Sequence, residues 1–441
     1  MKQLVEAKSI AIWGYGREGR ATYNFIKQSA IGAKLTIISD DKFDDYPKDC
    51  AVLFGPAGTD AIGEGKFDLI IKSPGISLYR PEINTAKKAG THFTSATNIW
   101  LAKNHGARTI AVTGTKGKST TAKLIHHILC EMGIKAELGG NVGRPLMEIE
   151  SPPEITVIEL SSYQIADLEV APDIAVALNL YPEHIPWHHN TENYYSDKLR
   201  IFTILPNPIA VLDATSAELK KRLSNLENVI WFNSPTSYSA NDAGVYRGDL
   251  EIISKNDSPL LGQHNLSNIA AALCVVEIVM GDLSHKVDEI KKAILNFVPL
   301  PHRLEPLGEK DGVLFVNDSI STTPQSALAA LKSFGDRKKI IILGGQDRGL
   351  DYTILAKGLA QNNVKAVLTV PDNGSLIARQ LRDISPETNI IECTNLENAV
   401  NQAKQIASIG DIVLLSPAAP SFGHFKDYTE RGDRFSALCG L

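Results

Sequence analysis

The chain has 441 residues, 43% of them hydrophobic and 22% charged, and its formal net charge is −5. This length predicts two to four domains of the usual about 100–200 residues. The acidic balance without a basic block argues against a nucleic-acid partner. The five scattered cysteines exclude a disulfide scaffold and favour a cytoplasmic protein. The longest apolar run, residues 269–280, contains Glu277 and is too short for membrane insertion.

The first predicted segment, residues 1–104, opens with a strand-like run that leads into a glycine turn. Residues 14–19 read G-x-G-x-x-G, and Asp40 follows the next strand-like run. This pattern matches the dinucleotide fingerprint, although a tight turn without a ligand stays open. The site could hold NAD or another nucleoside diphosphate. A second turn, residues 72–76, predicts further backbone amides at the same sheet edge.

The second predicted segment, residues 105–299, begins with an apolar strand, a glycine loop and a helix. The loop reads G-T-K-G-K-S-T from Gly114 to Thr120, which is shorter than the usual phosphate-binding spacing. Such a loop gathers backbone amides around phosphates, and the helix N-terminus adds partial positive charge. The alternative is a glycine-rich turn without a ligand.

Polar side chains that follow later strands of this segment predict a metal site. Glu159 ends a strand, where a carboxylate beside a phosphate loop can ligate Mg²⁺; the alternative is an ordinary strand-end carboxylate. His184 follows another strand, and a lone histidine there is either a ligand or a packed residue. Lys198 lies on a helical pattern and has no role from spacing alone. Asn265 is a candidate cap for the buried helix that follows.

The third predicted segment, residues 300–441, follows a proline-stiffened connector at 297–303. Polar turns after three strands, at 317–324, 344–349 and 416–422, predict one pocket at a shared sheet edge. Strand-like runs alternate with helical patterns throughout the chain, which predicts an α/β fold with parallel sheets. These runs lie at residues 9–13, 35–38, 69–71, 109–113, 156–158, 174–178, 340–343, 364–370 and 412–415.

The motifs taken together resemble the Mur ligases, the ATP-dependent amino-acid ligases of peptidoglycan precursor synthesis. In chain order they read G-T-K-G-K-S-T, E-L-S-S-Y-Q, N-x-x-x-E-H, Y-x-x-x-K-L-R, G-Q-H-N-x-x-N, P-H-R, N-D-S and L-L-S-P-A. The chain is most similar to members that add glutamate to UDP-N-acetylmuramoyl-L-alanine. That similarity depends on residues 73–76, the turn at 139–143 and the ending at 425–435.

The resemblance implies three domains: a Rossmann-like N-terminal domain for the UDP substrate, a central P-loop-type ATPase domain, and a C-terminal Rossmann-like domain that closes with the amino acid. It implies ATP and two Mg²⁺ ions as cofactors, and a monomer as the working form. The UDP-substrate contacts that it implies are Gly14, Tyr15, Gly16, Arg17, Asp40, Ser73, Gly75 and Asn141. The ATP contacts are Gly114, Thr115, Lys116, Gly117, Lys118, Ser119, Thr120, Asn265, Asn268, Arg303 and Asp318.

The resemblance also implies the catalytic and metal-binding side chains. The catalytic residues are Lys118, His184 and Lys198, with Lys198 carbamylated so that it carries a carboxylate-like group. The metal ligands are Ser119, Thr120, Glu159, His184 and Lys198. ATP would phosphorylate the substrate carboxylate, and the glutamate amine would attack the resulting acyl phosphate.

The acceptor pocket departs from the pattern of the most similar members. The implied glutamate contacts are Thr322, Arg348, Ser416 and Phe425. Ile320, Arg348, Pro420 and Gly423 are unusual at their positions. They indicate either drift within a D-glutamate ligase, which we favour, or a subfamily that adds L-glutamate. Enantiomers carry the same functional groups, so the sequence leaves this choice open.

Three other classes of protein compete with this interpretation. A folylpolyglutamate synthase-like ligase does not explain the N-terminal glycine turn. An NAD-dependent oxidoreductase leaves the phosphate loop, Glu159 and Lys198 without a function. A non-catalytic nucleotide-binding switch has no need for Lys118, Glu159, His184 and Lys198 together.

Overall fold

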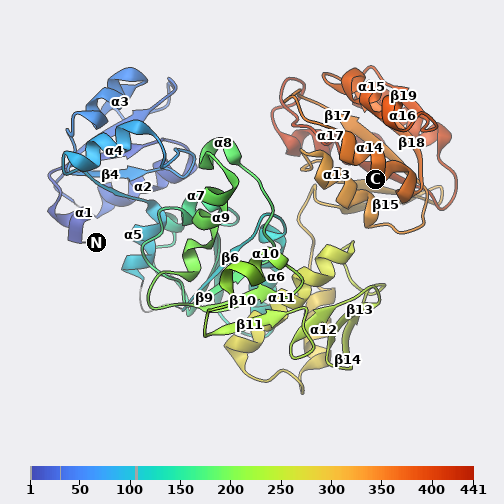
Figure 1. Cartoon of the computed structure of the whole chain (residues 1–441), viewed down its shortest axis with the longest axis horizontal. Coiled ribbons are helices and arrows are strands. Elements are labelled where there is room, and N and C mark those ends of the chain that lie inside the picture. The colour runs from blue at the N-terminus through green and yellow to red at the C-terminus, as the bar shows by residue number, and fades with distance from the viewer. Residues whose placement is uncertain (1, 30, 105–107) are drawn as a thin grey trace. The chain divides into compact units, whose positions relative to one another are not determined.

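The computed structural model describes residues 2–29, 31–104 and 108–441. Contacts divide the chain into two compact units, residues 1–257 with 266–297 and residues 258–265 with 298–441. The predicted division at 104/105 and 299/300 stays a prediction. Its first junction includes residues 105–107, which lie outside the described residues. Figure 1 shows the whole chain and labels many of its helices and strands.

The N-terminal part of the first unit is a five-stranded parallel sheet. Its strands β1 (Ser9–Trp13) and β4 (Leu69–Lys72) are short, mostly apolar and almost entirely buried, as expected for strands that are covered on both faces. The strand order is β3 (Ala51–Phe54), β2 (Lys34–Ser39), β1 (Ser9–Trp13), β4 (Leu69–Lys72) and β5 (His92–Thr94). The helices are α1 (Lys2–Glu6), α2 (Arg17–Gln28), α3 (Pro56–Gly63), α4 (Pro81–Lys88) and α5 (Ala96–Lys103).

The rest of the first unit contains a six-stranded parallel sheet and a small antiparallel one. The parallel order is β11 (Val229–Phe232), β10 (Ile209–Asp213), β9 (Ile174–Ala177), β6 (Arg108–Thr113), β8 (Ile155–Glu159) and β7 (Ala136–Gly140). The antiparallel strands are β12 (Tyr238–Ala240), β13 (Gly244–Arg247) and β14 (Leu250–Ser254). The helices are α6 (Lys118–Glu131), η1 (Leu146–Glu148), α7 (Ser162–Ile165), α8 (Ile185–His188), α9 (Thr191–Leu199), η2 (Arg200–Phe202), α10 (Ala217–Leu223), α11 (Gln263–Met280) and α12 (Val287–Leu295), and the first three residues of α11 are grouped with the second unit.

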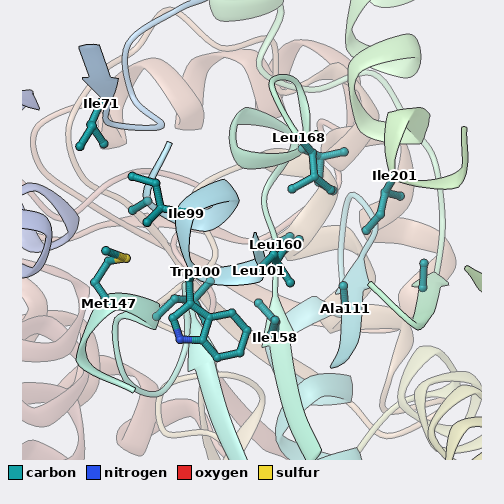
Figure 2. Close-up of a cluster of buried hydrophobic side chains, with 14 of the residues drawn as sticks. Ile71, Ile99, Trp100, Leu101, Ala111, Met147, Ile158, Leu160, Leu168 and Ile201 are labelled. Atoms are coloured by element: carbon teal, nitrogen blue, oxygen red, sulfur yellow. The ribbon is translucent and has the colours of Figure 1, made fainter. Parts of the chain in front are cut away.

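One apolar cluster contains side chains from both parallel sheets of the first unit. Figure 2 shows Ile99 and Trp100 of α5 beside Met147 of η1 and Ile158 of β8. The indole of Trp100 is 2% exposed and donates a hydrogen bond to the Ile149 carbonyl at 2.9 Å. Burying large apolar side chains here stabilises the packing of α5 against the central sheet.

The second unit contains a six-stranded sheet with one antiparallel edge strand. Its apolar contacts form two clusters, one with α13–α15 and one with α16 and α17, as expected for helices on opposite faces of a sheet. The strand order is β15 (Glu305–Lys310), β16 (Val313–Asn317), β20 (Ile412–Leu415), β17 (Lys339–Gly344), β18 (Val364–Val370) and β19 (Ile390–Glu392). The helices are α13 (Pro324–Lys332), α14 (Thr353–Leu359), η3 (Ala360–Asn362), α15 (Gly374–Ile384), α16 (Leu396–Ile406) and α17 (Tyr428–Cys439).

The predicted α/β class with parallel sheets is confirmed, and each predicted strand-like run coincides with a strand. The antiparallel sheet of β12, β13 and β14 was not predicted. Within the part of the chain that the structure describes, no helix is long and apolar enough to cross a membrane.

Candidate active site

The glycine loop connects the end of β6 to the start of α6, as predicted. Gly114 and Gly117 have φ values of +143° and +88°, which side-chain-bearing residues rarely adopt. A Cβ on Gly117 would lie 2.7 Å from Oδ1 of Asn268, so the loop also needs glycine for space. The sequence therefore builds a tight strand-to-helix turn with Lys118 at the first position of the helix.

Two lysine side chains converge on one carbonyl of this loop. Lys118 Nζ donates to the Gly114 carbonyl at 3.1 Å and to the Thr115 carbonyl at 3.0 Å. Lys198 Nζ, from the last turn of α9, donates to the same Gly114 carbonyl at 3.0 Å. The structure thus brings together two residues that lie 80 positions apart in the chain.

The Lys198 amine lies in a buried and electropositive environment. Its side chain is 2% exposed and its Nζ lies 5.1 Å from the centre of the Tyr194 ring. Burial lowers the pKa of Lys198 well below the usual lysine value, and the charge of Lys118 lowers it further. A neutral amine is a nucleophile, so Lys198 is suited to react with an electrophile.

Neighbouring elements hold the loop in place. The Thr115 amide donates to the Asn179 carbonyl at 3.0 Å, and the Lys116 amide donates to Asn179 Oδ1 at 2.8 Å. The Thr115 hydroxyl donates to the Tyr181 carbonyl at 3.1 Å and lies 2.8 Å from the Tyr194 hydroxyl. The loop is therefore preorganised by the segment after β9 and by α9.

Glu159 and the two hydroxyl residues of the loop lie at the same sheet edge. Glu159 is the last residue of β8, pairs in register with Val112 of β6 and is 5% exposed. Ser119 is half-buried and Thr120 is 2% exposed in the first turn of α6. A carboxylate and hydroxyl oxygens suit Mg²⁺, which commonly takes its remaining ligands from phosphates and water.

His184 is the N-cap residue that precedes the short helix α8, and its φ is +57°. Its Nε2 lies 3.8 Å from Glu183, whose carboxylate also pairs with Lys116 Nζ at 2.6 Å. Burial lowers the pKa of His184, the Glu183 carboxylate opposes this effect, and Lys198 reinforces it. Among the described residues, no three His, Cys, Asp or Glu side chains form a group that could hold a metal ion.

The N-terminal glycine turn and the second predicted turn meet at the carboxyl ends of β1 and β4. Ser73 Oγ donates to the Gly14 carbonyl at 3.0 Å, and a Cβ on Gly14 would lie 2.7 Å from Ser73. A Cβ on Gly19 would lie 2.1 Å from the Gly14 carbonyl, while the space around Gly16 is open. Gly75 is exposed in the second turn. The sequence therefore predicted this juxtaposition correctly.

The other predicted UDP contacts are partly engaged by the protein. Arg17 donates to the carbonyl of Gly143, in the turn that also carries the exposed Asn141. Asp40 accepts a hydrogen bond from Arg80. The ring of Tyr15 stacks on Phe43, with centroids 5.5 Å apart.

This stacking belongs to an aromatic cluster that sequence reasoning missed. Phe43 also meets Tyr46 and Phe54 edge to face, with centroids 5.8 Å and 5.4 Å apart. Only Tyr15 lay in a motif. The spacing of the other rings follows no secondary-structure period, so the sequence offered no signal for them.

In the second unit, the connector at residues 297–303 places Arg303 near Asp318. Asp318 directly follows β16, and it is 4% exposed. The Asp318 carboxylate accepts hydrogen bonds from the Leu304 amide at 3.1 Å, the Ser416 hydroxyl at 2.7 Å and the Ser321 hydroxyl. Burial raises its pKa to about 6 despite these bonds. Arg303 Nε is buried and has no hydrogen-bond partner among the described residues.

The predicted acceptor contacts do not all gather in one place. Phe425 lines a cavity of about 200 Å³ with Gly345, Leu396 and His424 at the carboxyl ends of β17, β18 and β20. Ser416 is buried and bonded to Asp318. Arg348 is exposed and Thr322 is half-buried, and neither lines this cavity.

The two predicted asparagines lie near the start of α11. This helix begins at Gln263, so Asn265 is inside its first turn and the predicted capping role is wrong. Asn265 Nδ2 instead donates to the Leu261 carbonyl. Asn268 lies against Gly117 of the phosphate loop.

Comparisons with known proteins agree with the layout of the loop and sheets. The Mur ligase middle domain matches residues 112–276, and the Mur ligase glutamate ligase domain matches residues 302–419. A protein of Xanthomonas axonopodis pv. citri named UDP-N-acetylmuramoyl-L-alanine--L-glutamate ligase is 38% identical over 99% of this chain and 96% of its own length. The chain belongs to the Mur ligase family. It is therefore an ATP-dependent ligase, and the family resemblance is confirmed.

More distant Mur ligase relatives have the same name or fold. The Salinispora tropica protein with the same printed name is 33% identical, over 98% of this chain and 97% of its own length. The MurC structure from Thermotoga maritima has a TM-score of 0.59 at 18% identity, covering 98% of this chain and 99% of that one. The MurF–ADP complex of the same organism has a TM-score of 0.59 at 17% identity, covering 99% and 98%. At these identities the structural matches support the fold alone.

Proposed function

We propose that this Mur ligase adds glutamate to UDP-N-acetylmuramoyl-L-alanine in peptidoglycan precursor synthesis, and that the acceptor is L-glutamate. The observation that carries the chemistry is the pair of Lys118 and Lys198 on the Gly114 carbonyl of the phosphate loop. The substrate assignment is supported by relatives with 33–38% identity over nearly the whole chain, all of which have L-glutamate in their names.

ATP binds, in this proposal, at residues 114–120 and places its phosphates over the N-terminus of α6. The helix dipole and Lys118 then stabilise negative charge on the phosphates. The ATP contacts that we propose in the second unit are Arg303 and Asp318. Support for the role of Arg303 comes from its buried Nε, which has no hydrogen-bond partner in the described structure.

Lys198 acts as a carbamate in the proposed enzyme. Its lowered pKa favours the neutral amine, whose lone pair can attack CO₂ and form an N–C bond while a proton leaves. The product carries a negative charge that the neighbouring Lys118 ammonium group attracts. Carbamylation would therefore be stabilised by Lys118 and would supply an oxygen ligand.

Two Mg²⁺ ions fit the donor groups available at this edge. Ser119, Thr120 and Glu159 would supply oxygen donors for the first ion, and His184 with carbamylated Lys198 would supply donors for the second. The buried Glu159 carboxylate at the end of β8 supports this fit. When bound, Mg²⁺ neutralises charge that develops on the transferred phosphoryl group.

The reaction proceeds through an acyl phosphate in our proposal. A carboxylate oxygen of the substrate attacks the γ-phosphorus of ATP, and the bond to ADP breaks. The glutamate amine then attacks the acyl carbon, loses a proton and expels phosphate as the amide forms. Lys118 holds the phosphates during the first step, which depends mainly on positioning and charge stabilisation.

The UDP substrate binds where the turns after β1 and β4 meet. The proposed contacts are Gly14, Tyr15, Gly16, Arg17, Asp40, Ser73, Gly75 and Asn141. Open space at Gly16, next to the N-terminus of the 12-residue helix α2, supports the approach of a diphosphate.

The stereochemistry of the acceptor distinguishes two forms of this proposal. Sequence reasoning favoured D-glutamate, whereas the names of the relatives favour L-glutamate. Both enantiomers offer two carboxylates, one of which Arg348 could bind in a bidentate manner. Thr322, Ser416 and Phe425 remain proposed contacts. A monomeric state and a cytoplasmic location stay predictions.

The deciding experiment measures phosphate release from ATP with UDP-N-acetylmuramoyl-L-alanine and either D- or L-glutamate. We expect release with L-glutamate and a product of the corresponding mass. Release with D-glutamate alone would overturn the stereochemical proposal, and release with neither would overturn the glutamate-ligase assignment. Omitting the UDP substrate provides the control for background ATP hydrolysis.

A further inference from the structure

A buried polar network surrounds His188, a residue to which the proposed reaction gives no role. His188 is 0% exposed, and its Nδ1 lies 2.6 Å from Oδ2 of Asp197. Because a carboxylate only accepts, the Nδ1–H donates in this bond. The other ring nitrogen, Nε2, lies 3.0 Å from the Ser162 hydroxyl.

Ser162, His188 and Asp197 are linked in the order of a Ser–His–Asp catalytic triad, but a substrate cannot reach the Ser162 hydroxyl. Ser162 is 2% exposed and lies at the start of α7, and the His188 ring is packed on Trp187 and Tyr163. A nucleophilic serine must reach its substrate, so the burial excludes this role. The network therefore holds side chains in position and does not itself attack a substrate.

Tyr79 joins the network from the N-terminal sheet. Its hydroxyl donates to Oδ2 of Asp197 at 3.1 Å, and its ring packs on His189 with centroids 4.9 Å apart. Tyr79 belongs to the segment after β4 that begins with Ser73. The Trp187 indole donates to the carbonyls of Pro74 and Gly75, both at 3.1 Å. The predicted UDP-substrate turn is thus tied to α8 and α9.

Helix α9 also holds the phosphate loop, through two side chains close to Asp197 in the sequence. Lys198, adjacent to Asp197, donates to the Gly114 carbonyl at 3.0 Å. Tyr194, one turn earlier, has its hydroxyl 2.8 Å from the Thr115 hydroxyl. Successive helical residues point about 100° apart, so α9 can bind the turn and the loop at once. A displacement of Asp197 would move the Lys198 amine with it.

We propose that Tyr79 and His188 are positioning residues that act through Asp197 to couple the UDP-substrate turn to Lys198. Substrate in the turn at residues 73–79 holds α9 in the orientation that keeps the Lys198 amine on the phosphate loop. This inference rests on the proposed function for the roles of the turn and of Lys198. Its physical basis is a pair of hydrogen bonds, from Tyr79 and His188, to the partly buried Asp197 carboxylate. Hydrogen bonds to a charged group are stronger than those between neutral groups.

The sharpest test replaces Tyr79 with Phe, which removes one hydroxyl and keeps the ring. We expect Tyr79→Phe to lower kcat about tenfold, the effect of one hydrogen bond to a charged group, with KM for ATP changed less than about twofold. Tyr246→Phe is the matched control, because the Tyr246 hydroxyl also donates to a carboxylate, Glu251, but lies in the antiparallel sheet. An unchanged kcat in Tyr79→Phe would overturn the proposal.

A pair of His188 variants separates positioning from general destabilisation. His188→Asn keeps an amide donor close to the Nδ1 position, whereas His188→Gln places its amide nearer the Nε2 position. We expect the Asn variant to retain at least about fivefold more activity at equal melting temperature, as the loss of one charge-assisted bond implies. Equal activities in two folded variants would contradict a role through Asp197.

Hydrogen exchange tests the coupling without turnover. In the chain without ligands, Tyr79→Phe should accelerate amide exchange in residues 191–199, and Tyr246→Phe should not. UDP-N-acetylmuramoyl-L-alanine should slow exchange in 191–199 of the unmodified chain and do so less in Tyr79→Phe. Unchanged exchange in a wild-type enzyme that releases phosphate would overturn the coupling alone. No phosphate release by the wild type would instead overturn the proposed function.

Discussion

Replacing Asp318 with Asn should stabilise the second unit at neutral and alkaline pH. Burial raises the Asp318 pKa from 3.8 to about 6, so folding favours the protonated carboxyl. A raised acid pKa gives stability that is fully present below pH 3.8 and lost as the pH rises through 6. The difference of about 2.2 units corresponds to about 3 kcal/mol at 1.36 kcal/mol per unit. The amide in the Asp318→Asn variant would have no charge to bury and could keep bonds to Leu304 and Ser416.

The assay is differential scanning calorimetry between pH 4.5 and 8, which resolves separate transitions of a chain with several parts. We expect Asp318→Asn to raise the midpoint temperature of one unfolding transition by on the order of 6 °C at pH 8. The difference in midpoint temperature between variant and wild type should narrow towards pH 4.5. Asp351→Asn is the control, because bonds to Thr353 lower the pKa of this exposed carboxyl below 3.8, so any stability that it contributes is constant between pH 4.5 and 8 and this variant should show no stabilisation that grows with pH. An Asp318→Asn variant less stable than wild type at pH 8, or a gap independent of pH, would refute this reasoning.

Three further predictions concern the proposed chemistry. Lys198→Ala should lower phosphate release at least about a thousandfold while leaving ATP binding within a few-fold, because only the proposed metal-ligating group is lost; substantial turnover of this variant would contradict the carbamate. Lys118→Ala should weaken ATP binding and slow acyl-phosphate formation by about a hundredfold or more, measured by single-turnover quench, and an unchanged ATP dependence would contradict the phosphate-loop assignment. Arg348→Ala should raise KM for glutamate about tenfold or more with KM for ATP unchanged, since a charge-assisted bond to a carboxylate is lost; an unchanged glutamate KM would remove Arg348 from the acceptor site.

The parallel strands were predictable because they are buried on both faces. β1, β9 and β20 are short apolar runs, and a continuous apolar run indicates a strand that is buried on both faces. The antiparallel β12 and β14 contain half-exposed polar residues and lack such a run. β15 contains Pro306 and Gly308, which read as turn residues, although its edge position tolerates both.

The part of the candidate site that could be predicted from the sequence is the phosphate loop, whose residues lie close together in the chain. Gly114, Gly117 and Lys118 act through local backbone geometry, so their spacing carried the signal. The Asn179 side chain, which makes two hydrogen bonds with the Lys116 backbone, lies 63 residues from it in the chain. The bond between Tyr79 and Asp197 spans 118 residues. Such pairs depend on how strands and helices pack, which no local pattern records.

The environment of Lys198 depends on tertiary structure and could not be predicted from its position in a helical pattern. On a helical pattern, a lysine is ordinarily a solvated side chain, yet here its amine is buried against a carbonyl that also binds Lys118. Two ammonium groups on one buried acceptor would oppose folding, and burial together with Lys118 lowers the pKa of Lys198 so that the neutral amine is favoured. A carbamate on Lys198, as proposed above, would carry a negative charge that Lys118 attracts. A buried, neutral lysine amine beside a cation is an arrangement that occurs mainly at functional sites, and it supports the proposed modification.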